Sequence, residues 1–190
     1  MLIVDRYSFT LALMRFIEEG EHTEDDLMNP SNPYSASKAA ADMLVKAWSR
    51  TYGLEYIILR PTNNYGSYQY PEKLIPLSVK LLQRGKKIRL HDEGLPTRNW
   101  LHAEDTANAV ISIINSGKTN EIYNVAGGFE QENRETVRKV IEDLGFKRKG
   151  QDVRYALNDD KLRTLGWKPQ KVFNEEIQKV VQFYIDNFKW

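Results

Sequence analysis

Apolar residues recur at two spacings along this chain, and the spacings predict helices alternating with strands. The clearest helix begins at Asn32-Pro33, because asparagine caps helices and proline suits the first helical position. Apolar positions follow at i, i+3, i+4 and i+7 as far as Gly53, a residue type that favours helix termination. These positions are Ala36, Ala40, Met43, Leu44, Ala47 and Trp48.

Short apolar runs between the helical patterns predict strands. Tyr56–Leu59 is apolar throughout, which is typical of a strand buried on both faces of a parallel sheet. Helical patterns and short apolar runs continue to alternate along the rest of the chain. We expect helices at 74–83, 103–116, 133–144, 158–165 and 174–188, and strands at 87–91 and 121–126. This order indicates an α/β fold.

The first 31 residues have the weakest periodicity. Leu2–Val4 predicts a buried strand, and apolar residues at helical spacing predict a helix over 10–19. The acidic run from Glu18 to Asp26 predicts a solvated loop.

Composition narrows the class of protein. A chain of 190 residues with 41% apolar residues can form one compact domain, or one domain and a small lobe. A net charge of +1 argues against a nucleic-acid-binding protein. The absence of cysteine excludes disulfides and thiolate chemistry, and the three histidines show no metal-ligand spacing. With no apolar run of about 20 residues and no basic leader, we expect a soluble cytoplasmic protein without membrane contact.

Tyr34 and Lys38 form a pattern that can carry chemistry. Four residues apart on a helix, they lie on one face, one turn apart. An ammonium beside a phenol favours the phenolate, which can take a proton from a sugar hydroxyl as hydride leaves the same carbon. With 10 tyrosines, about one chance Tyr-x-x-x-Lys is expected, so an exposed pair without a chemical role is the alternative.

Four blocks of sequence occur in a recognisable order over residues 22–190. They are Asn32-Pro-Tyr-Ser-Ala-Ser-Lys38, residues 63–76 beginning Asn-Asn-Tyr-Gly, Arg98-Asn-Trp-Leu-His-Ala-Glu-Asp105 and Leu165-Gly-Trp-Lys-Pro169. Together they resemble extended short-chain dehydrogenases/reductases of the dTDP-glucose (or UDP-glucose) 4,6-dehydratase branch.

The resemblance implies a nucleotide-sugar substrate and lyase chemistry with NAD. Hydride passes from the sugar C4 to NAD, water is lost across C5 and C6, and hydride returns to C6. Tyr34 then resembles the catalytic base, and Lys38 the residue that holds the ribose of NAD and favours the Tyr34 phenolate. Asn64 matches a cofactor-binding position near the nicotinamide.

Other positions match substrate contacts of the family. Arg98 is the expected pyrophosphate ligand, since a guanidinium fork suits phosphate oxygens. The expected substrate-binding set is Asn63, Lys73, Leu74, Arg98, Asn133 and Arg148, with 88–90 packing around the nucleoside. The alternatives are a tight loop for Asn63, Asn64 and Gly66, and solvated surface charges for Arg98 and Lys73.

The sequence also departs from the family pattern. None of the 11 glycines forms the Gly-rich turn that holds the NAD pyrophosphate, so we expect this chain to lack the N-terminal NAD-binding half. The family's Asp-Glu acid–base pair should lie between Tyr7 and Ile17, where there is no carboxylate. Near Arg148, Lys149 and Gln151 replace a proline and a histidine of the family.

We therefore predict a truncated Rossmann-like parallel sheet over 1–62, with its Tyr-x-x-x-Lys helix, interleaved with a small α/β substrate lobe over 63–190. The isolated chain is expected to be inactive or weakly active. The alternatives are a non-catalytic sugar-nucleotide-binding or oligomeric interaction module, or one half of a complemented enzyme. Loss of partner layers exposes apolar helix faces, so we expect a homo-oligomer.

Overall fold

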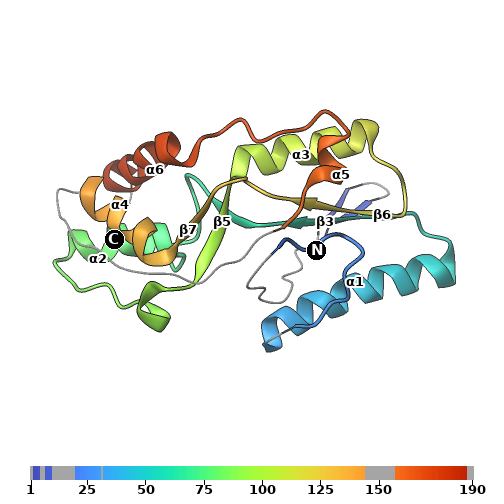
Figure 1. The fold of residues 1–190 in the computed structure, drawn as a ribbon, viewed down its shortest axis with the longest axis horizontal. Helices are drawn as coiled ribbons and strands as arrows, with labels where there is room; N and C mark the ends of the chain where they lie inside the picture. The colour runs from blue at the N-terminus through green and yellow to red at the C-terminus, as the bar shows by residue number, and fades with distance from the viewer. Residues whose placement is uncertain (1, 5–6, 10–19, 31, 144–156, 188–190) are drawn as a thin grey trace.

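Strands and helices alternate from Pro33 onward in the computed structural model, which describes residues 2–4, 7–9, 20–30, 32–143 and 157–187 (Figure 1). The strands are β1 (Leu2–Val4), β2 (Tyr7–Phe9), β3 (Ile57–Pro61), β4 (Asn63–Tyr65), β5 (Thr97–His102), β6 (Glu121–Val125) and β7 (Glu130–Glu132). The helices are α1 (Pro33–Tyr52), α2 (Leu74–Gln83), α3 (Ala103–Ser116), α4 (Asn133–Asp143), α5 (Asp160–Arg163) and α6 (Phe173–Asn187), with a 3-10 turn η1 (His91–Gly94).

The sheet structure is divided between two main groups of strands. β3 and β6 are parallel, with Ile57 opposite Glu121 and Pro61 opposite Val125. β5 is the middle strand of a second sheet, parallel to β4 and antiparallel to β7. β1 and β2 form a separate antiparallel pair. Parallel pairing through intervening helices is the α/β architecture that the alternation predicted.

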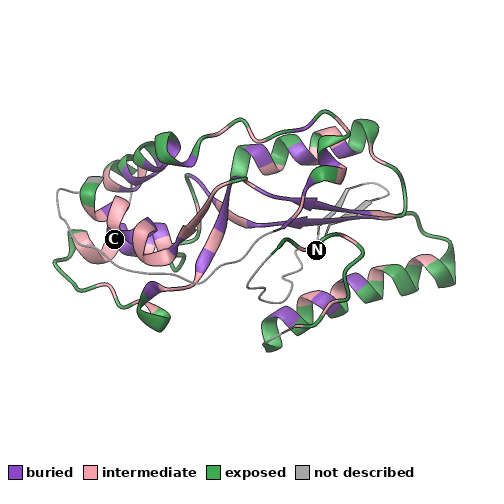
Figure 2. Cartoon of the chain, viewed as in Figure 1, coloured by how far each residue is buried: buried purple, intermediate pink, exposed green. Residues whose placement is uncertain are grey.

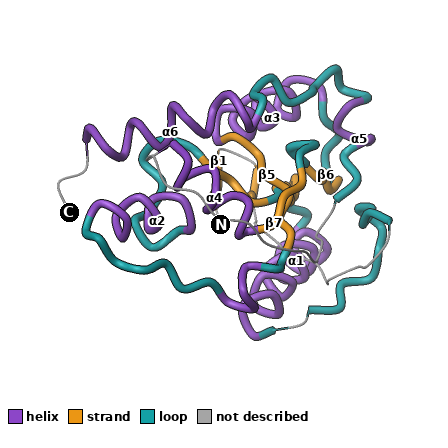
Figure 3. Tube along the Cα trace, turned by 60° about the vertical axis from the view of Figure 1, so that its left-hand side comes forward, coloured by secondary structure: helices purple, strands orange, loops and turns teal. Residues whose placement is uncertain are grey.

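Two hydrophobic cores meet at β5. One packs Leu59 of β3 and Leu101 of β5 against Ile113 of α3, and the other packs Trp100 of β5 against Phe173 of α6. Trp100 and Leu101 join different cores because successive strand residues point to opposite faces. Figures 1 and 3 show α1 and α3 on opposite sides of β3 and β6, and α2, α4 and α6 grouped at one end.

Most expected elements are confirmed. The helices over 74–83 and 103–116 have the predicted bounds, and the others differ at their ends by one to two residues. The helix predicted over 158–165 is shorter, spanning Asp160–Arg163. The helix predicted over 10–19 lies outside the described residues.

The strand predicted at 87–91 is wrong. Residues 87–90 have no regular structure, and the 3-10 turn η1 follows, in which Asp92 and Glu93 have positive φ angles of 46° and 54°. Ile88 and Leu90 are half-buried. Their alternation therefore reflects two half-buried side chains in a segment that has no partner strand among the described residues, which a β-ladder requires.

Helix α1 turns its apolar stripe outward (Figure 2). Met43, Leu44 and Trp48 are 58%, 60% and 55% exposed. The buried residues of α1 are instead Ser35, Ala39 and Asp42. The start and end follow the sequence signals: Asn32 Oδ1 accepts the Ser35 N–H at 2.8 Å, and Gly53 adopts φ 67° beyond the last turn.

Asp105 joins the chain's C-terminal segment to α3. Its side chain is buried at 1% exposure, and its two carboxylate oxygens accept the backbone N–H groups of Gln170 and Lys171, each at 2.9 Å. Its backbone carbonyl accepts Trp167 Nε1–H at 3.2 Å. These bonds fix the segment that leads into α6.

Replacing Asp105 by alanine should lower the free energy of unfolding by about 3 kcal/mol, because two backbone donors lose a charged acceptor. Urea unfolding followed by circular dichroism measures the change. Asp186→Ala is the matched control, since Asp186 is an exposed carboxylate that accepts a side-chain bond from Gln182, and it should cost less than about 0.5 kcal/mol. Equal effects of the two substitutions would contradict the anchoring role.

Candidate functional site

Tyr34 and Lys38 lie together in the first two turns of α1. Tyr34 is 55% exposed, and Lys38 Nζ lies 5.6 Å from the centre of the Tyr34 ring, within cation–π range. The first turns of α1 lie at the end of the helix nearer β5 and β7 (Figure 1). The Tyr34 phenol is therefore accessible to solvent at the start of the helix.

Three expected substrate residues lie in or next to the second sheet. Asn63 pairs with Trp100, two residues beyond Arg98 in β5. Arg98 pairs with Gln131 in β7, and the backbone N–H of Asn133 donates to Pro96 O at 3.1 Å. Asn63, Arg98 and Asn133 thus come from neighbouring strands and the helix start that follows them.

Asn64 is held firmly within the fold. Its Nδ2 donates to Thr62 O at 3.1 Å, its Oδ1 accepts Thr106 Oγ1–H at 2.8 Å, and its backbone carbonyl accepts Gln69 Nε2–H at 2.7 Å. Because strand side chains alternate, Asn63 and Asn64 point to opposite faces of the sheet. The neighbouring Asn99 ties Thr62 to the Gly127 N–H through bonds of 3.0 and 2.8 Å.

The loop before α2 is clamped by Tyr184 of α6. The Tyr184 hydroxyl accepts the Gln69 N–H at 2.6 Å and donates to Gly66 O at 2.9 Å. Burial raises the pKa of Tyr184 to about 12, so the hydroxyl stays protonated and able to donate. Lys73 and Leu74, at the start of α2, are exposed and half-buried, so both are accessible beside this loop.

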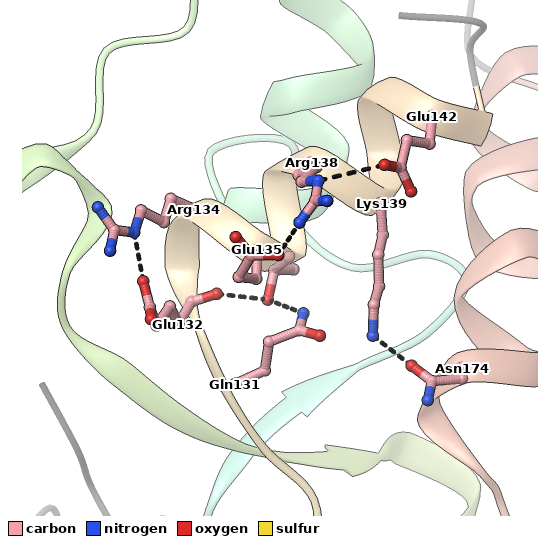
Figure 4. Close-up of polar contacts among 9 residues, drawn as sticks. Gln131, Glu132, Arg134, Glu135, Arg138, Lys139, Glu142 and Asn174 are labelled. Atoms are coloured by element: carbon pink, nitrogen blue, oxygen red, sulfur yellow. Dashed lines mark hydrogen bonds and ion pairs between the residues drawn. The ribbon is translucent and has the colours of Figure 1, made fainter. Parts of the chain in front are cut away.

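Charged side chains pair along α4 and just before it (Figure 4). Arg134 forms an ion pair with the buried Glu132, and Arg138 bridges Glu135 and Glu142. Figure 4 shows these side chains paired along and just before the helix. The Arg134–Glu132 pair joins the start of α4 to the end of β7, on either side of Asn133 in the sequence.

His102 ends β5 and caps α3. Its side chain is buried, and its Nδ1 accepts the Glu104 N–H at 3.3 Å. Burial lowers the pKa of His102, while the carboxylates of Glu104, Glu176 and Asp105 act in the opposite direction. The neutral imidazole therefore matches its capping role.

Several expectations fall elsewhere. Arg148 and the segment between Tyr7 and Ile17, apart from β2, lie outside the described residues. Among the part of the chain that is described, no group of three His, Cys, Asp or Glu side chains is arranged to hold a metal ion. Sequence reasoning missed Asp42, Arg60 and Tyr184, since each acts through a partner distant in sequence.

Comparison with known proteins gives a family match. The model of the NAD dependent epimerase/dehydratase family matches residues 14–126. The dTDP-glucose 4,6-dehydratase 1 of Escherichia coli (strain K12) is 41% identical over 185 residues, covering 88% of this chain and 51% of that protein. The chain spans about half the length of the curated relatives it matches.

Solved structures agree with this match. The dTDP-glucose 4,6-dehydratase of Bacillus anthracis, crystallised in complex with NAD, superposes with a TM-score of 0.86 at 38% identity, covering 97% of this chain and 62% of that one. The dTDP-glucose 4,6-dehydratase of Streptomyces venezuelae, solved with NAD and TYD bound, gives 0.87 at 36% identity and covers 95% and 60%. Both relatives carry the Rossmann-like fold class.

His102 should make stability depend on pH. Because its pKa is lower in the folded chain than its unfolded value of about 6.5, its contribution is complete above that pH and is lost as pH falls. His102→Asn keeps a capping acceptor that does not titrate, so the free energy of unfolding measured by urea should fall less between pH 7 and 5. The exposed His91→Asn is the control, and a variant curve as steep as that of the parent chain would refute this role.

Proposed function

Because this chain belongs to the NAD dependent epimerase/dehydratase family, we propose that it serves nucleotide-sugar 4,6-dehydratase chemistry on a dTDP-linked sugar. The observation that carries the proposal is the Tyr34–Lys38 pair, exposed at the start of α1 with the ammonium 5.6 Å from the ring centre. Relatives at about 40% identity named dTDP-glucose 4,6-dehydratase support the choice of sugar nucleotide.

The roles of the residues follow from their chemistry. Tyr34 exchanges a proton with the sugar C4 hydroxyl, and Lys38 places a positive charge 5.6 Å from the centre of the Tyr34 ring. Arg98 supplies paired N–H donors to the diphosphate. Asn63 and Asn133, from the adjacent strand and helix start, donate amide hydrogens to the same phosphates.

NAD, when bound, supplies hydride acceptance and return. The residues present fit one end of it: the Tyr34 hydroxyl and the Lys38 ammonium suit the ribose hydroxyls, and the Asn64 side chain, held by Thr62 and Thr106, suits a wall beside the nicotinamide. No Gly-rich turn for the pyrophosphate occurs in these 190 residues. We therefore propose that the 190-residue chain alone binds NAD weakly and converts the sugar nucleotide slowly or not at all.

A homo-oligomer is part of the same proposal. The exposed apolar residues of α1 form a single stripe along the helix. They are Ala36, Ala40, Met43, Leu44, Ala47 and Trp48. Trp48 packs on Tyr52 at 4.9 Å between ring centres, which extends this apolar surface. A continuous stripe of this kind is typical of a helix that packs against another chain, and a second copy supplies a matching stripe through two-fold symmetry.

A binding module, or one half of a complemented enzyme, is the second candidate function. The shared hydrophobic core of α2, α4, α6 and β5 supports it, since Arg98 lies on β5 and Asn133 at the start of α4. No helix in the described ranges is long and apolar enough to cross a membrane. A cytoplasmic location belongs to the proposal and is supported by the absence of cysteine.

Calorimetric titration with dTDP-glucose tests the substrate assignment. We expect binding without NAD, and Arg98→Ala should weaken it by about 10- to 100-fold, since charged hydrogen bonds to phosphate are lost. Arg163→Ala is the matched control, because Arg163 pairs with Asp159 in α5 and should leave affinity unchanged. Equal affinity for UDP-glucose would contradict the preference for a thymine nucleotide. Binding of neither sugar nucleotide would overturn the proposal.

Charge placed on the α1 stripe should dissociate the oligomer. The double substitution Met43→Glu and Leu44→Glu buries carboxylates in the proposed contact, so we expect a monomer in sedimentation equilibrium. Ile111→Glu with Ile114→Glu is the matched control, since these α3 residues are 55% and 41% exposed. A parent chain that is already monomeric, or equal dissociation by both pairs, would contradict the α1 interface.

A further inference from the structure

Asp42 and Arg60 form a buried ion pair between α1 and β3. Arg60 Nε lies 3.0 Å from Asp42 Oδ2, and their side chains are 2% and 0% exposed. Asp42 continues the row of Tyr34 and Lys38, at i, i+4 and i+8 on the helix. The apolar stripe of α1 faces outward, and among the described residues this pair is a buried charged contact between the helix and the sheet.

The Arg60 guanidinium also holds a third segment. Its Nη1 donates to Glu24 O at 3.2 Å, and its Nη2 approaches Met28 Sδ at 3.7 Å. The same segment is bonded to β6, because Glu24 Oε1 accepts the Asn124 N–H at 2.9 Å and His22 O accepts Asn124 Nδ2–H at 3.0 Å. We name residues 22–28 the strap.

The position of Arg60 connects both parts of the candidate site. Arg60 lies three residues before Asn63, in the strand that leads directly into β4. Asp42 lies two turns from Tyr34, about 12 Å along the helix axis. One buried contact therefore joins the Tyr34 helix to β3, the strand that leads into Asn63.

We propose that Arg60 is a positioning residue: with Asp42 and the strap, it sets where Tyr34 and Lys38 stand relative to Asn63 and Asn64. This inference rests on the proposed function of the Tyr34–Lys38 pair. Arginine suits the role because its planar fork directs separate N–H groups to the helix, the strap carbonyl and the strap sulfur at once. Lysine keeps the charge but cannot maintain all three directions.

A single and a double substitution separate the effect on the position of α1 from the effect on the stability of the fold. Removing one partner of a buried ion pair leaves an unpaired charge, whereas replacing both by apolar residues often restores stability. Arg60→Met should therefore shift the unfolding equilibrium by about a hundredfold or more. Asp42→Leu combined with Arg60→Met should recover most of this loss and still leave α1 without its directed contacts.

A spin-label distance measures the position of α1. The chain has no cysteine, so Lys46→Cys in α1 and Asn108→Cys in α3, both exposed, are the labelling sites. Labelled chain diluted with unlabelled chain should give one narrow distance. In the stable Asp42→Leu/Arg60→Met chain, the distribution should broaden about twofold, because α1 then opens locally.

Controls make each outcome decisive. Lys161→Met breaks the Lys161–Glu121 ion pair of 2.6 Å and should leave the distance unchanged. Arg60→Lys should keep the α1 distance closer to the parent value while hydrogen exchange of the strap increases. If the double variant regains stability and keeps the narrow parent distance, Arg60 is merely structural and the proposal fails. Titration of the same variants with dTDP-glucose reports separately on the proposed function, since affinity should persist through Arg98.

Discussion

The alternation of side chains along β5 is the constraint on which both halves of the molecule depend. Leu101 faces the core beneath α3, and Trp100 faces the core of α6, so one strand seals two hydrophobic clusters. The backbone at Gly127 lies so close to β5 that a Cβ on this residue would be 1.7 Å from Trp100 O. A one-residue slip of β5 would exchange the two faces and disrupt both cores.

The polar contacts of the interior add direction to this packing. Asp105 binds the segment entering α6, and Tyr184 of α6 returns to hold the loop at Gly66 and Gln69. Arg60 performs a comparable task for α1. In each case a buried polar group has its hydrogen-bond partners on segments far away in sequence. These bonds fix the relative placement of the segments.

The two faces of α1 differ in their contacts. The helix uses a narrow polar face for the sheet and leaves its apolar stripe for another surface. The pairing of β4 and β7 with β5 places Asn63, Arg98 and Asn133 on neighbouring elements.

The sequence by itself predicted most of the helices and the residue types that can carry chemistry. The Asn32-Pro33 start, the Gly53 stop and the Tyr34–Lys38 spacing are local signals, so they could be read without a structure. The tertiary structure alone decided which face of α1 is buried, because periodicity marks an apolar stripe but not what covers it. It also decided that Asp42 meets Arg60 and that 87–91 is not a strand, since ion pairs and β-ladders depend on partners brought together only by folding.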